Sequence, residues 1–243
     1  MSFHPHPVLR DYYRDDADRQ QFVNGLFDSS AHHYDWVDEV LSFGSGRWYR
    51  GQVLRDAGLR EGMRVCDVAV GTGRVAVSAR EIVGDKGLVV GIDPSRGMLR
   101  MAQQKVDARF VQAVGEALAL RSSEFDFLTM GYALRHVSDL GAAFREYHRV
   151  LKPGGRVVLL ELTVPESRFG AGVLRTYMKN IAPMIVRVGT RSRDAERMMR
   201  YYWETTNSCV PPETIMEALR SVGFTEVKRA VRYGALTEYL ATK

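Results

Sequence analysis

"VCDVAVGTGRVAV" (residues 65–77) joins the pattern of an apolar strand to two glycines and then to the pattern of a helix. The spacing Gly71-x-Gly73-x-x-Ala76 is typical of a turn that lets the backbone approach an adenosine-bearing cofactor closely. Asp93 ends the next strand pattern, about 20 residues beyond the turn, where a carboxylate can accept hydrogen bonds from two ribose hydroxyls. The stretch therefore predicts a cofactor site at the carboxyl edge of an α/β sheet.

An acidic residue, Asp67, stands before the first glycine and indicates which adenosine cofactor binds. A dinucleotide places its pyrophosphate at the helix N-terminus, and a carboxylate just before the loop would repel it. S-adenosylmethionine (SAM) carries an ammonium and a sulfonium and has no phosphate. In addition, the first strand begins only at Arg64, whereas a dehydrogenase would place its loop near the N-terminus. We therefore expect SAM, with NAD as the alternative.

Strand and helix patterns alternate through the middle of the chain. Strands are predicted at residues 64–68, 88–92, 109–112, 125–130 and 156–162, and helices at 73–82, 95–106 and 140–151. Short connections between alternating elements are typical of a doubly wound, mostly parallel, Rossmann-like sheet. Residues 224–231 and 235–241 predict an antiparallel strand pair at the C-terminus.

We divide the chain into four regions. Residues 1–60 form an N-terminal helical region, and residues 61–164 form the SAM-binding α/β core. Residues 165–210, rich in methionine and aromatic side chains, are predicted as a helical insertion that covers the acceptor site. Residues 211–243 supply a helix and the strand pair that completes the sheet.

The composition restricts the class of protein. The 243 residues are 45% hydrophobic, enough to fill a core, and no apolar run approaches the ~20 residues that cross a bilayer. The N-terminus is polar and acidic, unlike a signal peptide, so we expect a cytoplasmic protein. Two distant cysteines and scattered histidines predict neither a disulfide nor a metal site. The net charge of +5 is concentrated in arginines between residues 187 and 200.

Three further stretches carry a family resemblance. "AHHYDWVDEVLSFGSGRW" (31–48), "YALRHVSDL" (132–140) and "RVLKPGGRVVLLELTVPES" (149–167) are similar to segments of the ubiquinone/menaquinone biosynthesis C-methyltransferases. The chain resembles this class I SAM-dependent family from about residue 31 to its C-terminus. The resemblance implies a seven-stranded sheet with a helical cover, SAM as cofactor and methylation of a ring carbon in a prenylated hydroquinone.

The resemblance also implies site residues. It implies SAM contacts at Thr72, Asp93, Val114, Gly115 and Gly131. With the residues of the glycine turn and their neighbours, the full set of expected cofactor contacts is Tyr34, Asp67, Gly71, Thr72, Gly73, Asp93, Pro94, Val114, Gly115 and Gly131.

The same comparison places Arg135 and His136 beside the reacting ring, as the catalytic pair. His136 stands where the family has asparagine, and an imidazole with a pKa near ~6.5 can accept a phenolic proton at neutral pH. Arg135 stays protonated and can stabilise a phenolate. Val37 and Asp38 also depart from the family, which has Met-Asn in the first signature.

The leading hypothesis is therefore SAM-dependent methylation of a small aromatic acceptor that can carry an isoprenoid tail. O- or N-methylation of a soluble secondary metabolite is the alternative with the same chemistry. A nucleic-acid methyltransferase would suit the basic charge, yet residues 131–134 lack the Asn/Asp-Pro-Pro-Tyr motif, so we expect no nucleic-acid partner. A non-catalytic SAM-binding module, peripheral membrane contact through the arginines and a homodimer are left open.

Overall fold

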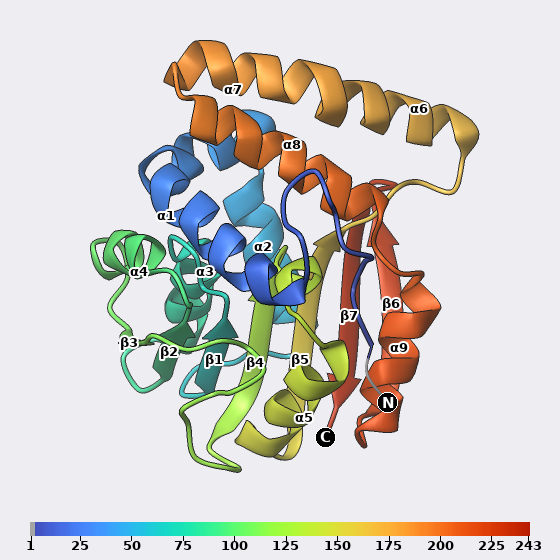
Figure 1. Cartoon of the computed structure of the whole chain (residues 1–243). Coiled ribbons are helices and arrows are strands. Elements are labelled where there is room, and N and C mark those ends of the chain that lie inside the picture. The colour runs from blue at the N-terminus through green and yellow to red at the C-terminus, as the bar shows by residue number, and fades with distance from the viewer. Residues whose placement is uncertain (1–2) are drawn as a thin grey trace.

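The computed structural model describes residues 3–243, and a seven-stranded sheet runs through its centre (Figure 1). The strand order is β3-β2-β1-β4-β5-β7-β6, and β7 alone runs in the direction opposite to the other six strands. The strands are β1 (Arg64–Val68), β2 (Leu88–Ile92), β3 (Arg109–Val111), β4 (Phe125–Gly131), β5 (Leu151–Leu162), β6 (Thr225–Arg232) and β7 (Leu236–Thr242). This arrangement confirms the predicted doubly wound sheet and its C-terminal antiparallel pair.

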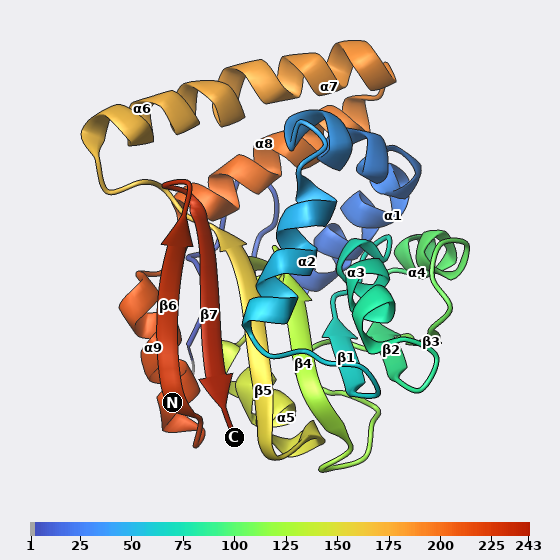
Figure 2. The same ribbon diagram turned by 180° about the vertical axis from the view of Figure 1, so that it is seen from behind.

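Helices cover both faces of the sheet (Figures 1 and 2). α5 (Leu140–Val150) and α9 (Pro212–Ser221) pack on one face, and α2 (Gly46–Asp56) and α3 (Arg74–Val83) pack on the other, with α4 (Arg96–Gln103) near the β3 edge. Because β1, β4 and β5 are covered on both sides, consecutive residues are buried along most of β1 and β4 and along the second half of β5, rather than every other one.

A third layer lies over the carboxyl ends of the strands. It contains α1 (Asp16–Leu41), α6 (Arg168–Thr176), the π-helical turn η2 (Tyr177–Ile181), α7 (Ala182–Thr190) and α8 (Arg193–Asn207). α6, η2 and α7 form one long rod above α8 (Figures 1 and 2). The chain reverses after α7 at Arg191, whose φ of 53° is left-handed. These helices share a hydrophobic core of their own with residues 8–13.

The structure corrects two of the predicted boundaries. The helix that the sequence pattern predicts over residues 21–40 of the N-terminal region begins earlier, at Asp16, where the Asp15 side chain accepts a hydrogen bond from the backbone N–H of Asp18. β5 begins at Leu151 rather than Arg156, and the segment between them bulges out of register with β4.

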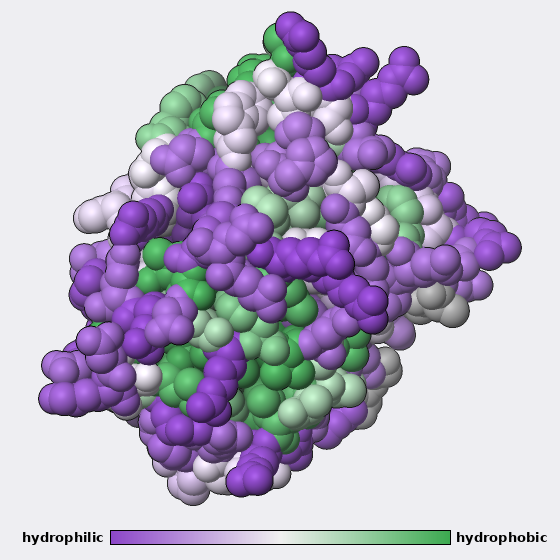
Figure 3. Space-filling model, turned by 90° about the vertical axis from the view of Figure 1, so that its left-hand side faces the viewer, coloured by the Kyte–Doolittle hydropathy of each residue, from purple (hydrophilic) through white to green (hydrophobic). Residues whose placement is uncertain are grey.

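One edge of the sheet is formed by β3, and the other by β6. β3 has three residues, and Arg109 is exposed on it, which limits pairing with another chain. The surface on this side is largely polar, with apolar side chains gathered in its lower half (Figure 3). Within residues 3–243, no helix combines the length and the apolar character needed to span a bilayer.

Candidate functional site

The strand order reverses between β1 and β4, and a cavity lies at the carboxyl ends of these strands. Such a switch point is where open α/β sheets bind ligands. The cavity holds about 770 Å³ of empty space, its open mouth included, and we call it the switch-point cavity. The predicted site residues that line it are Tyr34, Gly71, Asp93, Pro94, Val114, Gly115, Gly131 and His136.

Asp93 is buried in the wall of this cavity and is fixed by two backbone N–H groups. Its Oδ2 accepts a hydrogen bond from Gly71 N, and its Oδ1 accepts one from Ser95 N, both at 2.9 Å. Burial raises the pKa of this carboxyl to about 6, although the two N–H donors act in the opposite direction. Each oxygen keeps a free lone pair, so the carboxylate can accept hydrogen bonds from two neighbouring hydroxyls.

Asp67 lies outside the cavity lining, because it belongs to β1 rather than to the loop. Its Oδ1 accepts a hydrogen bond from Thr129 Oγ1 at 2.7 Å, and its Oδ2 has no partner within residues 3–243. Burial raises the pKa of this carboxyl to about 7. An unpartnered carboxylate oxygen beneath the site fits a cofactor with a cationic group, reached directly or through water.

The glycine turn contributes backbone rather than side chains. Gly71 and Gly73 have φ of 55° and 88°, values that favour glycine. Gly73 packs against Ala102 and does not line the cavity, and neither does Thr72, whose Oγ1 donates to Asp35 Oδ1 on α1 at 2.5 Å. These two predicted contacts are therefore placed behind the cavity wall.

His136 lies in the short 3₁₀ turn η1 (Leu134–His136) that follows β4, and it lines the cavity. Its ring stacks on Tyr201 at 5.5 Å and meets Phe27 edge-on at 5.2 Å. Neither ring nitrogen has a hydrogen-bond partner in the described part of the chain. Burial, and then the charges of Arg135 and Arg19, lower the pKa of His136 well below its ordinary value of 6.5. The imidazole is therefore neutral at physiological pH.

Arg135 is buried beside His136 but does not line the cavity. Its Nη1 forms an ion pair with Glu161, and its Nε donates to Thr205 Oγ1 at 3.1 Å. Its guanidinium lies 3.9 Å from the ring centroid of Tyr202. Burial lowers the pKa of Arg135, but the Glu161 carboxylate outweighs it and raises the pKa overall, so Arg135 stays charged.

A second cavity lies under the helical cover, and we call it the cover chamber. It holds about 1430 Å³ of empty space, its mouth included, and most of its walls are apolar or aromatic. Tyr34, Tyr132 and Tyr202 line both cavities, so the two meet at these three rings. Burial raises the pKa of each phenol, which keeps the shared wall neutral.

Several wall residues were missed at the level of sequence. α1 contributes Gln20, Val23, Asn24 and Phe27 to the switch-point cavity, and α8 contributes Tyr202. The α1 residues follow the helical spacing i, i+3, i+4, i+7, which marks one face of the helix and is the signal that could have found them.

Comparisons with known proteins agree with this geometry. The model of the ubiE/COQ5 methyltransferase family matches residues 14–243. Ubiquinone/menaquinone biosynthesis C-methyltransferases UbiE of Shewanella sp. (strain W3-18-1) and Shewanella putrefaciens are 33% identical over 220 residues, which cover 87% of this chain and 86% of each relative.

Solved structures share the fold. A SAM-dependent methyltransferase from Aquifex aeolicus superimposes with a TM-score of 0.56 at 20% identity, covering 79% of this chain and 88% of its own. A phosphoethanolamine N-methyltransferase 2 from Haemonchus contortus, solved with S-adenosylhomocysteine, gives a TM-score of 0.62 at 18% identity, covering 95% of this chain and 59% of its own.

Proposed function

Because the chain belongs to the ubiE/COQ5 methyltransferase family, we propose that it transfers a methyl group from SAM to a ring carbon of a prenylated hydroquinone. The observation that carries this proposal is the pair of cavities that meet at Tyr34, Tyr132 and Tyr202. The switch-point cavity has the polar groups that suit a cofactor and an aromatic ring. The cover chamber has the apolar walls that suit an isoprenoid tail.

SAM supplies an electrophilic methyl group and a positive charge. In this proposal Asp93 accepts hydrogen bonds from the ribose diol, and Asp67 compensates positive charge from below the cavity. Gly71, Pro94, Val114, Gly115 and Gly131 form the wall around the bound cofactor. At Gly115 and Gly131, an added Cβ would lie within 2.8 Å of Tyr147 Oη and 2.7 Å of Val75 Cγ2, so no side chain fits there.

The acceptor ring becomes nucleophilic when its phenol loses a proton. His136 is neutral and has two unpartnered ring nitrogens, so one of them can accept this proton. A phenol is a weaker acid than imidazolium, which opposes the transfer. The buried charges of Arg135 and Arg19 stabilise a phenolate beside them and so lower the pKa of the phenol, which favours the transfer, although they lower the pKa of His136 as well. Arg135 is thus a positioning and charge-stabilising residue.

The reaction is tested by incubating the enzyme with SAM and geranylhydroquinone, followed by mass spectrometry and NMR of the product. We expect one added methyl group on a ring carbon, with both oxygens unmethylated. A methyl ether as the product would contradict C-methylation and support the O-methyltransferase alternative.

We expect acceptors with a tail to be preferred strongly. Burial contributes about 0.8 kcal/mol per methylene, so one isoprene unit in the cover chamber should lower KM by at least about tenfold relative to a tailless hydroquinone. Leu174→Gln, in the chamber wall, should reduce this preference, whereas Val173→Gln, exposed on the outside of α6, should not. Equal kcat/KM for tailed and tailless acceptors would show that the chamber does not hold the tail.

We also propose that the mouth of the cover chamber rests on an anionic membrane surface. Phe43 and Tyr233 line the chamber and are 86% and 75% exposed, and Phe169 at the start of α6 is 84% exposed. The exposed basic residues of α6 and η2, in the long rod above α8, are Arg168, Arg175 and Lys179. Apolar side chains flanked by basic ones are typical of interfacial segments.

We expect weak binding to vesicles that contain phosphatidylglycerol, measured by co-sedimentation. High salt should weaken this binding, because it screens the basic side chains. Phe43→Ser combined with Phe169→Ser should remove most of it, since both rings are exposed. Purely neutral vesicles are the control, and equal binding to both vesicle types would exclude the electrostatic contribution.

A further inference from the structure

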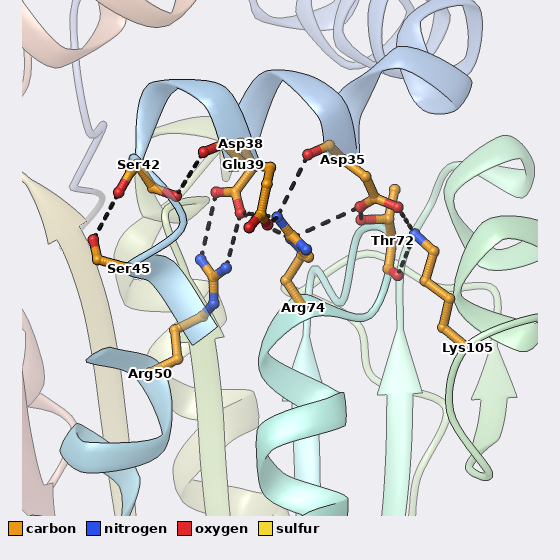
Figure 4. Close-up of polar contacts among 9 residues, drawn as sticks. All are labelled: Asp35, Asp38, Glu39, Ser42, Ser45, Arg50, Thr72, Arg74 and Lys105. Atoms are coloured by element: carbon orange, nitrogen blue, oxygen red, sulfur yellow. Dashed lines mark hydrogen bonds and ion pairs between the residues drawn. The ribbon is translucent and has the colours of Figure 1, made fainter. Parts of the chain in front are cut away.

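The last two turns of α1 contact elements that belong to both cavities. Tyr34 lines both of them, and Val37 and Leu41 line the cover chamber. On the adjoining face of the helix, Asp35, Asp38 and Glu39 point toward the glycine turn and the start of α3 (Figure 4). The position of α1 therefore determines the shape of both cavities.

The Asp38 carboxylate is shared by two arginines from different parts of the fold (Figure 4). Its Oδ2 accepts hydrogen bonds from Arg50 Nη2 and Arg74 Nε, both at 2.8 Å. Burial alone would raise the pKa of Asp38, but the two guanidiniums lower it overall. Asp38 is therefore ionised, and it is the counter-ion that allows the two arginines to lie close together.

Arg50 is the partner on the acceptor side. It lies in α2, is only 3% exposed and lines the cover chamber but not the switch-point cavity. Its Nε has no hydrogen-bond partner among the described residues. A Cβ at Gly46 would lie 2.8 Å from Arg50 Nη2, so the glycine makes room for the guanidinium in this position.

Arg74 is the partner on the cofactor side. It is the first residue of α3 and directly follows Gly73 of the glycine turn. Its Nη2 also pairs with Glu39, at 2.8 Å. On the other side of the turn, Thr72 and Lys105 bond to Asp35 of the same helix. α1 thus holds the turn that carries Gly71 through three carboxylates, one of which, Asp38, is bonded to Arg50 as well.

We propose that Asp38 couples the two cavities, so that the cofactor and the acceptor bind cooperatively. This inference rests on the proposed function, because it takes the cover chamber as the acceptor site. In this proposal each bound ligand favours the position of α1 in which Asp38 bonds both Arg50 and Arg74. It thereby stabilises the cavity wall that the other ligand needs. By linkage, each ligand then raises the affinity for the other by the same factor.

The first test measures the affinity for S-adenosylhomocysteine by calorimetry, with and without geranylhydroquinone. In the wild type we expect the acceptor to raise this affinity by roughly fivefold or more. Asp38→Asn should reduce the factor to about one. Glu39→Gln is the matched control, because Glu39 is exposed on the same helical turn and pairs with Arg74 but not with Arg50. This variant should keep the wild-type factor.

The second test requires no acceptor. Arg50→Met changes the chamber side only, yet coupling through Asp38 should weaken S-adenosylhomocysteine binding by roughly fivefold or more. Arg47→Met is the control in the same helix, since Arg47 is exposed and pairs with Glu81 of α3 rather than with α1. Its cofactor affinity should equal that of the wild type.

The two tests separate the coupling from the proposed function. If geranylhydroquinone does not bind the wild type, the proposed acceptor is wrong, and the Arg50→Met measurement decides the coupling by itself. Wild-type cofactor affinity in Arg50→Met would overturn the coupling. So would an undiminished acceptor effect in Asp38→Asn.

Discussion

Replacing His136 with asparagine is expected to lower kcat by roughly two to four decades, the range that a positioned general base contributes. Asparagine keeps a similar size and hydrogen-bonding capacity, but it cannot accept the phenolic proton. The affinity for SAM should stay within about twofold in calorimetry, because the substitution removes a proton acceptor that acts only in the transition state. This pair of results would place His136 in the reaction rather than in cofactor binding.

The pH profile distinguishes this role from a structural one. In the proposed role the neutral imidazole is the active form, so kcat/KM should fall as the pH drops through the pKa of His136. Because burial and Arg135 lower that pKa, the acidic limb should lie below pH 6.5, and activity should be flat from there to neutral pH. With SAM saturating at every pH, so that the titration of Asp93 does not contribute, His136→Asn should lose this limb. An asparagine variant with full activity and an unchanged profile would assign proton removal to another group.

Asp93→Ala is expected to raise the Kd for SAM by one to two decades, or ~1.4–2.7 kcal/mol. The variant loses two charge-assisted hydrogen bonds to the ribose hydroxyls and also leaves the N–H groups of Gly71 and Ser95 without their acceptors. Asp28→Asn is the matched control. Asp28 accepts hydrogen bonds from Ser95 Oγ and Gly97 N at the start of α4, next to Asp93, but does not line the cavity.

The pH dependence of SAM binding supplies a second readout. In the proposed role the ionised carboxylate of Asp93 accepts hydrogen bonds from both ribose hydroxyls, so wild-type affinity should fall as the pH drops below about 6, the pKa of Asp93. The fall in affinity near pH 6 should disappear in Asp93→Ala. A change in affinity near pH 7 that persists in this variant would be assigned to the titration of Asp67. Unchanged affinity in Asp93→Ala, or tighter binding of NADH than of SAM, would contradict the assignment.

The sheet, the glycine turn and the position of Asp93 followed from the sequence by itself. Apolar strands covered on both faces and helices with a 3.6-residue period leave local patterns, and a carboxylate that ends β2 must lie at the carboxyl edge beside the turn. The resemblance implied the family, which the comparisons confirm.

The tertiary structure alone decided which side chains face the ligands and how they are charged. Thr72 turns to Asp35, Asp67 is buried in β1, and the pKa of His136 falls. The shared wall of the two cavities combines Tyr34 of α1 with Tyr132 after β4 and Tyr202 of α8. Burial, Coulomb interactions and cavity shape depend on neighbours in space, and here those neighbours are distant in the chain: 37 residues for Thr72 and Asp35, and 116 residues for Arg19 and Arg135.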